Sequence, residues 1–378
     1  MLDKPPSSNS SNLAPKAAIL TFHNTPNFGA TLQCFALTSF LQSKGMQVEV
    51  INYMPPHNLL QYGKSLFLGK RRSAQNFSRI LKFYHFVKSH IRMSGAPVFS
   101  SSKLRELTKK EYDIAFTGSD EVWKVDHMRK FDPSYYLSFL NEKRTRLVAY
   151  AATASTVTNL HDYKSQVSPL LSRFSALGIR DSSTKAMVDQ LTSTPSQEVL
   201  DPTLIWNFES MDLPPLFTDK YVAVYSWLSD SDMSIVRDFA SSNNLKVVCV
   251  GCRHRHADMN FLGIGPEEWL RLIKHSSTVI TDFFHGVLFS IIFKRPFFAH
   301  VDEKKKMKLT QALAWVGLND RLHSNFSALI SQSPMSLDAD WENVKMKLSP
   351  LRLQSISFLE EQIMSASSPS RTINNGFL

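Results

Sequence analysis

The sequence is poor in cysteine and has no long apolar run. Three cysteines in 378 residues are too few for the disulfide framework of a small secreted domain. The N-terminal stretch MLDKPPSSNSSNLAPK lacks the apolar core of a signal peptide, so we expect residues 1–16 to form a disordered leader. No apolar stretch approaches the ~18 to 20 residues that span a bilayer. We therefore expect a soluble, cytoplasmic protein.

Long runs of one charge are also missing, although the net charge is +10. A basic surface attracts anions such as nucleic acid, anionic lipid or phosphorylated small molecules. The densest basic clusters, at residues 70–72 and 304–308, are short and typical of solvated faces. We therefore expect no nucleic-acid partner. The hydrophobic share of 43% indicates a globular chain with ample material for a core.

The sequence contains no P-loop, no GxSxG, no HExxH and no complete GxGxxG motif, which argues against an NTPase, a triad hydrolase and a dinucleotide enzyme. Cys249 and Cys252 form a C-x-x-C pattern with His254 and His256 close behind, which is typical of a zinc or redox site. The short spacer between the cysteines and the histidines leaves little reach for a tetrahedral site. We therefore favour a buried strand end, and we expect no metal and no cofactor.

Apolar strand patterns alternate with helical patterns along most of the chain. A strand at 17–22, a helix at 30–45 and a strand at 47–53 form the first unit, which predicts a parallel sheet. The alternation resumes after the prolines of residues 212–220. We predict an α/β protein of two Rossmann-like, doubly wound halves, at residues 17–211 and 212–335, followed by a C-terminal helix and tail at 336–378.

Two segments are less regular. Residues 57–108 are polar, basic and aromatic, and we expect irregular helices there. The last helix candidate, residues 341–363, contains Pro350 and should bend or break at that residue. The basic stretch at 70–92 could lie on an anionic membrane as a peripheral contact, although we favour a plain amphipathic connection. The aromatic residues that could take part in this contact are Phe67, just before the stretch, and Phe83, Tyr84 and Phe86 within it.

Polar turns follow several of the apolar strands, at the edge where open α/β sheets bind ligands. These turns are HNTPNFG (23–29), GSD (118–120), IRD (179–181) and TDFFHG (281–286). A helix that starts at such a turn offers free amide groups and a positive dipole end to phosphate or carboxylate. His285 would lie at this mouth with a proton available near neutral pH, or would merely cap the helix.

The other turn residues also allow two interpretations. Arg180 suits a carboxylate or phosphate ligand, or forms a salt bridge with Asp181 or Asp201. Asp201 itself, directly before a proline, is interpreted as a structural turn rather than a catalytic carboxylate. The GSD turn is either part of a ligand site or a helix cap. Asn27 could bind a sugar hydroxyl or start a helix.

Taken in order, six stretches resemble the polysaccharide pyruvyl transferase family. They are NFGATLQCFALTSFLQSKGMQVEVINYMP, YDIAFTGSDEVW, RLVAYAAT, IRDSST, VLDPTLIW and VITDFFHGVLFSIIFKRPF, within residues 17–320. The resemblance implies two Rossmann-like halves in a glycosyltransferase-B-like arrangement. It also implies transfer of a pyruvyl group from phosphoenolpyruvate onto two hydroxyls of one sugar, giving a ketal, in surface polysaccharide synthesis. The acceptor would be a sugar, an oligosaccharide or a lipid-linked glycan.

The resemblance carries the family's acid/base histidine onto His285 and its anion-binding arginine onto Arg180. We predict His285 and Asp120 as catalytic residues. The predicted substrate-binding residues are Asn27, Gly29, Gly118, Ser119, Arg180, Thr281, Gly286 and Lys308.

The sequence departs from the family pattern in two places. Phe283 stands where some members have arginine or serine, and GSDEVWK replaces GSDQVWN, so that Glu121 and Lys124 differ. Two alternatives therefore remain. The chain could be a glycosyltransferase with a nucleotide-sugar donor, for which Glu267-Glu268-Trp269 is a candidate binding segment, or a binding protein that keeps the fold without catalysis.

Overall fold

The computed structural model describes residues 14–55, 73–106, 110–126, 130–155, 157, 160–301 and 306–367. Several predictions lie outside these ranges. They concern most of the leader, the first part of the irregular segment with Phe67 and the basic cluster at 70–72, the first two residues of the basic cluster at 304–308, and the end of the C-terminal tail.

The first half contains a parallel six-stranded sheet in the order β2-β1-β3-β4-β5-β6. The chain order reverses between β1 and β3, because β2 is added on one side of β1 and all later strands on the other. Such a switch point leaves a crevice at the carboxyl ends of the strands. The strands are β1 (Lys16–Leu20), β2 (Gln47–Val50), β3 (Ile114–Thr117), β4 (Arg146–Ala152), β5 (Ala176–Ile179) and β6 (Ser196–Glu198).

The second half repeats this plan with the order β12-β11-β10-β7-β8-β9, again all parallel. Its switch point lies between β7 and β10. The chain therefore has the two doubly wound α/β halves that the alternating pattern predicted. The strands are β7 (Tyr221–Tyr225), β8 (Lys246–Val250), β9 (Met259–Phe261), β10 (Thr278–Thr281), β11 (Phe297–His300) and β12 (Leu322–His323).

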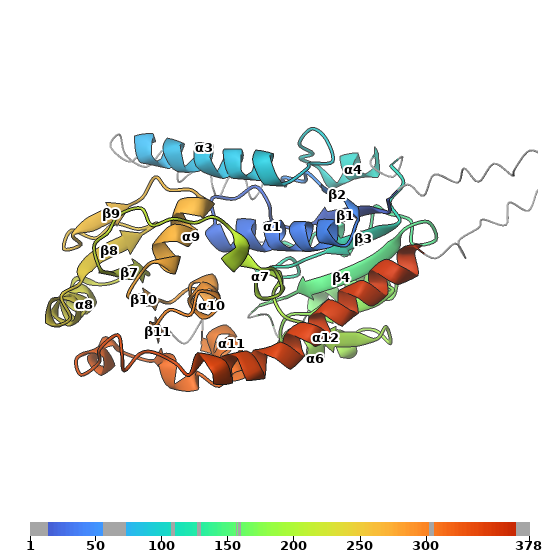
Figure 1. Cartoon of the computed structure of the whole chain (residues 1–378). Helices are drawn as coiled ribbons and strands as arrows, with labels where there is room; N and C mark the ends of the chain where they lie inside the picture. Colours follow the sequence, from blue (N-terminus) through green and yellow to red (C-terminus); the bar gives the residue numbers. More distant parts are fainter. Residues whose placement is uncertain are drawn as a thin grey trace, which may run out of the picture.

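Helices cover both sheets and fill the space between the halves (Figure 1). The α-helices are α1 (Phe28–Ser43), α3 (Ser73–His90), α4 (Ser101–Leu104), α5 (Lys164–Leu171), α6 (Ser182–Asp189), α7 (Pro202–Ile205), α8 (Asp230–Ser242), α9 (Pro266–Lys274), α10 (Phe284–Ile292), α11 (Lys306–Val316) and α12 (Trp341–Ser367). Short 3₁₀ helices are η2 (Pro133–Tyr136), η3 (His161–Tyr163), η4 (Phe208–Ser210), η5 (Asn319–Arg321) and η6 (Phe326–Leu329).

Helix α1 is the central helix of the molecule. Every residue from Phe28 to Leu41 is buried, and the helix contacts α7 of its own half as well as α9 and α10 of the second half. Because α1 is apolar on all sides, it can be surrounded by protein on all sides. Its first turn is thereby held at the boundary between the two halves.

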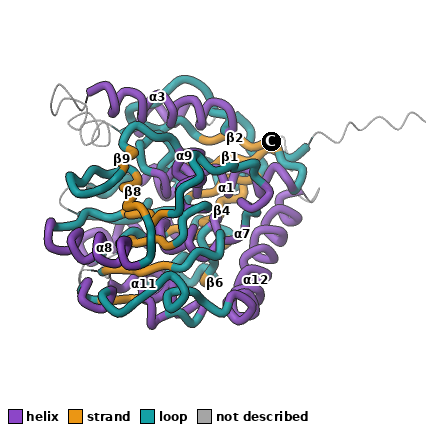
Figure 2. Tube along the Cα trace, turned by 60° about the vertical axis from the view of Figure 1, so that its left-hand side comes forward, coloured by secondary structure: helices purple, strands orange, loops and turns teal. Residues whose placement is uncertain are grey.

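Helix α12 returns from the second half to the first (Figures 1 and 2). It contacts α11 of the second half and, further along, α7 and β4 of the first half. The predicted break at Pro350 is wrong, because the helix continues through this residue to Ser367. Packing on both sides of the proline offsets the lost backbone hydrogen bond, which costs ~3 kcal/mol. Beyond it, Phe358 and Leu359 are buried.

Candidate functional site

The two switch points meet across the boundary between the halves. His285 is the second residue of α10, which follows β10, and its ring lies against Gly29 in the first turn of α1. A Cβ atom added to Gly29 would lie 2.1 Å from Nδ1 of His285. Only glycine leaves room for the imidazole here. The side chain of His285 is 12% exposed, so the ring is mostly enclosed.

Asp201 lies at the centre of the buried polar cluster around His285. Its Oδ2 atom accepts hydrogen bonds from Nη1 of Arg180 at 3.1 Å and from Oγ of Ser119 at 3.3 Å. The same oxygen lies 3.6 Å from Nε2 of His285. The carboxylate is completely buried, and Arg180 is 5% exposed. One carboxylate oxygen therefore holds together a cation, a hydroxyl and an imidazole from both halves.

The charges around Asp201 keep it ionised. Burial alone would raise the pKa of its carboxyl group, but the neighbouring His285, the charge of Arg180 and the amide of Thr203 outweigh burial and lower the pKa. Oδ1 accepts from that amide at 3.1 Å and from the hydroxyl of Thr203 at 2.8 Å. The anion is thus stabilised on both oxygens, and the site carries a fixed negative charge beside His285.

Arg180 connects this cluster to the start of α10. Its guanidinium carbon lies 4.9 Å from the centre of the Phe284 ring, in cation–π contact. Because Asp201 occupies only Nη1 among the donors of the planar fork, further donors can serve an anion. The predicted salt bridge between Arg180 and Asp201 is therefore present, and it uses only one of the nitrogen atoms of the guanidinium group.

The start of α10 offers a second set of donors. Phe283 at the N-cap forms no side-chain cap hydrogen bond with this helix. The amide groups of the first turn therefore have no side-chain cap from that residue, and they carry the positive end of the helix dipole. Thr281 and Gly286 have a structural role at the start of α10. A Cβ atom on Gly286 would lie 2.2 Å from Oγ1 of Thr281, which donates to the carbonyl of Tyr225 at 2.8 Å.

The GSD turn after β3 forms the opposite wall. Gly118 has φ +101°, and a Cβ atom there would lie 2.3 Å from the carbonyl oxygen of Tyr150. Ser119 is buried and directs its hydroxyl to Asp201. Asp120 accepts through Oδ1 from the amide of Glu121 at 2.8 Å. The turn therefore presents Ser119 to the histidine cluster, while Asp120 stabilises its own backbone.

A second ionic cluster joins the halves beside this turn. Lys308 of α11 forms an ion pair with Glu121, which also accepts from Oγ of Ser155 at 2.9 Å and lies 3.3 Å from Nζ of Lys124. Burial lowers the pKa of Lys308 to about 8, although the charge of Asp120 acts in the opposite direction. The predicted substrate residue Lys308 thus faces the GSD turn across the boundary.

Asn27 has a structural position. Its Oδ1 atom caps α1 by accepting from the amide of Ala30 at 3.2 Å, so this oxygen is already used.

The sequence interpretation missed Asp201, which it regarded as a structural turn. Its other oxygen does cap α7, and only the fold brings Arg180, Ser119 and His285 onto Oδ2. The available signal was its place in VLDPTLIW, one of the stretches that resemble the family.

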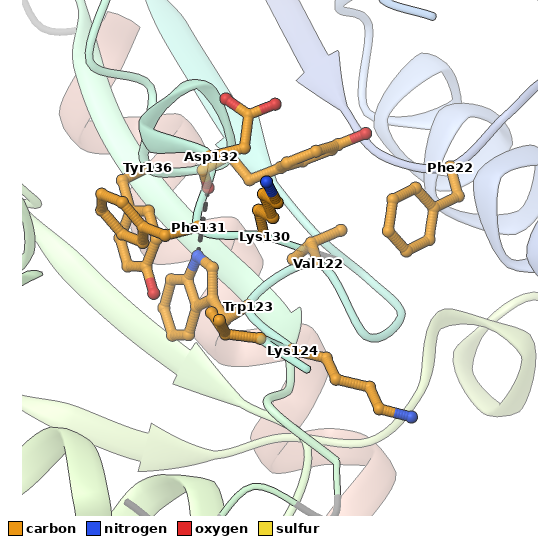
Figure 3. Close-up of a pocket in the computed structure, with 10 residues that line it drawn as sticks. Phe22, Val122, Trp123, Lys124, Lys130, Phe131, Asp132 and Tyr136 are labelled. Carbon is orange, nitrogen blue, oxygen red and sulfur yellow. Dashed lines mark hydrogen bonds between the residues drawn. The ribbon is translucent and has the colours of Figure 1, made fainter. Parts of the chain in front are cut away.

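A small pocket of about 20 Å³ lies beside residues 122–124, which follow the GSD turn (Figure 3). Its lining includes Phe22, Lys124, Phe131 and Asp132, with Trp123 behind them. The indole of Trp123 donates to the carbonyl of a neighbouring tyrosine at 3.0 Å, drawn as a dashed line in Figure 3. Aromatic rings combined with a few charged groups are a common lining for polar ligands with apolar faces.

The segment considered for a nucleotide does not form an open slot. Trp269 is 0% exposed and stacks on Phe28 in the core, with ring centres 5.4 Å apart. Glu268 accepts from the amide of Gly265 at 2.7 Å and pairs with Lys82. These contacts argue against base stacking on this tryptophan.

The structure supports no metal centre among the residues that it describes, since no group of three or more His, Cys, Asp or Glu could hold an ion there. Cys249 and Cys252 are free and buried at the end of β8. Within the same part of the chain, no helix is both long enough and apolar enough to cross a membrane.

Comparison with known proteins agrees with this architecture. A family model described as polysaccharide pyruvyl transferase matches residues 27–301, well over half of the chain. No curated protein matches. Arabidopsis thaliana UGT89C1 complexed with UDP-L-rhamnose has a TM-score of 0.50 at 11% identity, over 94% of this chain and 100% of that one. UDP-GlcNAc 2-epimerase from Methanocaldococcus jannaschii has a TM-score of 0.51 at 10% identity, over 90% of this chain and 99% of that one.

The two solved structures show the fold alone, and they confirm the predicted glycosyltransferase-B-like arrangement of two α/β halves. The family match is specific to the chain's sequence. The chain belongs to the polysaccharide pyruvyl transferase family, a family of enzymes.

Proposed function

We propose that this member of the polysaccharide pyruvyl transferase family moves the pyruvyl group of phosphoenolpyruvate onto two hydroxyls of one sugar. The product would be a cyclic ketal on a surface polysaccharide such as an exopolysaccharide, or on its precursor. We further propose that the enzyme works in the cytoplasm, where this donor is formed.

The proposed reaction forms two C–O bonds and breaks one. A first sugar hydroxyl loses its proton to the acid/base group as it attacks C2 of phosphoenolpyruvate, while C3 gains a proton and becomes a methyl group. The C2–O bond to phosphate then breaks, and phosphate leaves with the electron pair. A second hydroxyl of the same sugar attacks C2 and loses its proton. The reaction needs an acid/base group near C3 and the hydroxyls, and positive groups around the carboxylate and phosphate.

His285 is the group we assign to proton transfer. The single observation that carries the proposal is the packing of His285 beside the buried carboxylate of Asp201, 3.6 Å away, at the uncapped start of α10. A carboxylate next to an imidazole fixes its orientation and stabilises its protonated form during proton transfer. Asp120, predicted as a second catalytic residue, is proposed instead to stabilise the turn that presents Ser119.

The donor's negative charges would be bound from both halves. Arg180 and the first amide groups of α10 are the proposed ligands of one anionic group, since Arg180 packs on the ring of Phe284, the first residue of α10. Lys308 is the proposed ligand of the other, exchanging Glu121 for the donor. Gly29 and Gly286 would act by leaving space for His285 and for the start of α10.

The acceptor sugar is proposed to approach across the mouth of the small pocket in Figure 3 and to stack on its aromatic rim. This pocket lies directly beyond Glu121, because Lys124 lines it and also pairs with Glu121. A sugar ring there would place its hydroxyls toward the boundary between the halves.

Isothermal titration of the full chain with phosphoenolpyruvate tests the donor. We expect saturable binding that Lys308→Ala weakens at least ten-fold, while Lys345→Ala on helix α12 leaves it unchanged. His285→Asn should retain binding, because the proposed role of His285 is proton transfer. Binding of a nucleotide sugar without binding of phosphoenolpyruvate would refute the proposal.

A further inference from the structure

The outer face of α3 carries a line of exposed apolar side chains. Phe77, Leu81 and Tyr84 are 65%, 42% and 57% exposed. Their spacing of four and three residues places them on one face of the helix. Figures 1 and 2 show α3 along the outside of the molecule, over elements of both halves. Isolated exposed apolar residues are ordinary, but three in line on one helix are typical of a contact surface.

The opposite face of α3 accounts for the packing of the helix. Phe83 and Phe86 are each 5% exposed; Phe83 packs on Phe28 of α1 with tilted rings, and Phe86 packs edge-on against Phe35 of the same helix. The sequence alone allowed these two phenylalanines to contact a membrane, but their burial against α1 excludes this contact. The outer apolar line is not needed to hold α3 in place, because the inner face already anchors it.

The charges next to this line are positive. Helix α3 contains three cations and no carboxylate: Arg79 is directed inward onto the Phe28 ring, Lys82 pairs with Glu268, and Lys88 remains beside the apolar line. Lys88 lies at the end of the apolar line, with Nζ 5.9 Å from the centre of the Tyr84 ring. A lysine beside interfacial aromatic rings can keep its charge in the headgroup layer while its chain lies along apolar surface.

A groove of about 750 Å³ runs beside the apolar line, between α3 and α9. Its lining includes Lys82, His85 and His90 of α3 and Arg271 of α9, together with two glutamates of α9. One of those glutamates is already paired with Lys82. The Nε atom of Arg271 is buried and has no hydrogen-bond partner among the residues that the structure describes. Although this Nε atom is itself enclosed, Arg271 as a whole is only half-buried, so the groove presents a cationic side chain that suits an anionic ligand.

We propose that the outer face of α3 is a docking surface for an anionic lipid bilayer. Phe77, Leu81 and Tyr84 enter the interface between headgroups and acyl chains, and the groove with Arg271 receives a lipid phosphate. An apolar line flanked by cations is the pattern of helices that lie in a membrane interface. This surface is separate from the proposed pyruvyl transfer, and its test does not depend on that activity.

Two other occupants fit less well. A second copy of the chain, docked by its own α3, would offer Lys88 no carboxylate to pair with, because the facing helix has none. A nucleic acid backbone would use the cations and leave Phe77 and Leu81 in water. A lipid surface uses both the charges and the apolar side chains.

Flotation of the full chain with vesicles tests the proposal. We expect binding to vesicles of phosphatidylcholine mixed with phosphatidylglycerol, and little binding to phosphatidylcholine alone. Replacing Phe77, Leu81 and Tyr84 by serine should lower the bound fraction at least ten-fold. Arg271→Gln should weaken only the binding to anionic vesicles.

A matched triple variant controls for loss of surface hydrophobicity. Ile330, Met335 and Leu353 are 71%, 83% and 64% exposed on elements away from α3. Their replacement by serine should leave vesicle binding unchanged. Equal binding by the α3 variant and the wild type overturns the proposal, as does failure of the wild type to bind anionic vesicles. Dimerisation that only the α3 variant abolishes, without vesicle binding, overturns it in favour of a second copy.

Discussion

The Asp201→Asn substitution removes one charge from the centre of the candidate site and keeps the volume of the side chain. Asp201 is completely buried, and its Oδ2 lies 3.1 Å from Arg180 and 3.6 Å from His285. The asparagine can still cap α7, because its amide oxygen can accept the same two hydrogen bonds from Thr203. The substitution therefore tests the charge and not the turn.

The distances set the expected size of the effect. At an effective dielectric constant of about 20, a full charge at 3.1 to 3.6 Å gives an attraction of about 5 kcal/mol. Part of this energy only offsets the cost of burying the charges, and breaking a buried pair costs about 3 to 5 kcal/mol. We expect Asp201→Asn to lower the free energy of unfolding by about 3 kcal/mol. We expect kcat/KM to fall on the order of 10²- to 10³-fold, because the imidazole loses its counter-charge.

Three measurements decide the matter. Urea unfolding gives the stability, titration with phosphoenolpyruvate gives donor binding, and phosphate release with an identified acceptor gives the rate. Ser119→Ala is the matched control, because it removes one hydrogen bond to Asp201 and keeps the charge. It should cost less than ten-fold in rate. A rate for Asp201→Asn within two-fold of the wild type would refute the assignment of Asp201 as the partner of His285.

The same substitution has a pH signature. The pKa of Asp201 is lowered from its ordinary value of 3.8 in the folded state, so the unfolded state binds the proton first as the pH falls. Its contribution to stability is fully present above pH 4 and is lost as the pH falls through the lowered value. The difference in stability between wild type and Asp201→Asn should therefore shrink below about pH 4. A constant difference down to pH 2 would contradict the lowered pKa.

Three further predictions concern the walls of the site. Gly29→Ala places a Cβ atom 2.1 Å from Nδ1 of His285, so activity should fall at least about 100-fold. The control Gly178→Ala, whose added Cβ atom has its nearest contact at 3.0 Å, should lose far less activity. Equal losses in steady-state kinetics would contradict the role of Gly29 in making room for His285. Burial lowers the pKa of Lys308 to about 8, so the KM for the donor should rise above that pH as the amine loses its proton. Lys308→Arg should remove this rise. If the donor KM of the wild type stays constant up to pH 10, Lys308 does not bind the donor. Glu121→Gln leaves Lys308 without its carboxylate, so donor titration should show several-fold tighter binding, and weaker binding would contradict competition between Glu121 and the donor.

The repeated α/β plan could be predicted from the sequence because its core strands are short apolar runs between polar turns. The helix expected at 30–45 lies at Phe28–Ser43 instead, since Asn27 caps it two residues earlier. Helix α3 was expected to be irregular. It has aromatic residues on its outer face as well as its inner face, so the apolar residues do not mark one side. Exposed apolar residues of this kind obscure the period that identifies a helix.

The candidate site was only half predictable. His285 and Arg180 follow apolar strands, and the carboxyl-end rule for parallel sheets brings such residues to one edge. Asp201 looks the same as any aspartate that caps a short helix, and one of its oxygens does cap α7. Its second role depends on how close the two halves come. The packing of α1 sets that distance, and no local sequence pattern predicts it.

The departures from the family pattern are connected in the structure. Phe283, which stands where some members have a cation, packs on Tyr225 with ring centres 4.5 Å apart and places no charge at the start of α10. The second half supplies a cation from α11 instead, since Lys308 reaches the GSD turn. Glu121, the other departure, neutralises that cation in the absence of a ligand. An anionic donor must therefore displace a carboxylate to reach Lys308, which couples donor binding to a contact between the two halves. Variants at Phe283 and Glu121 should accordingly be non-additive in donor affinity, because both act on the same charge.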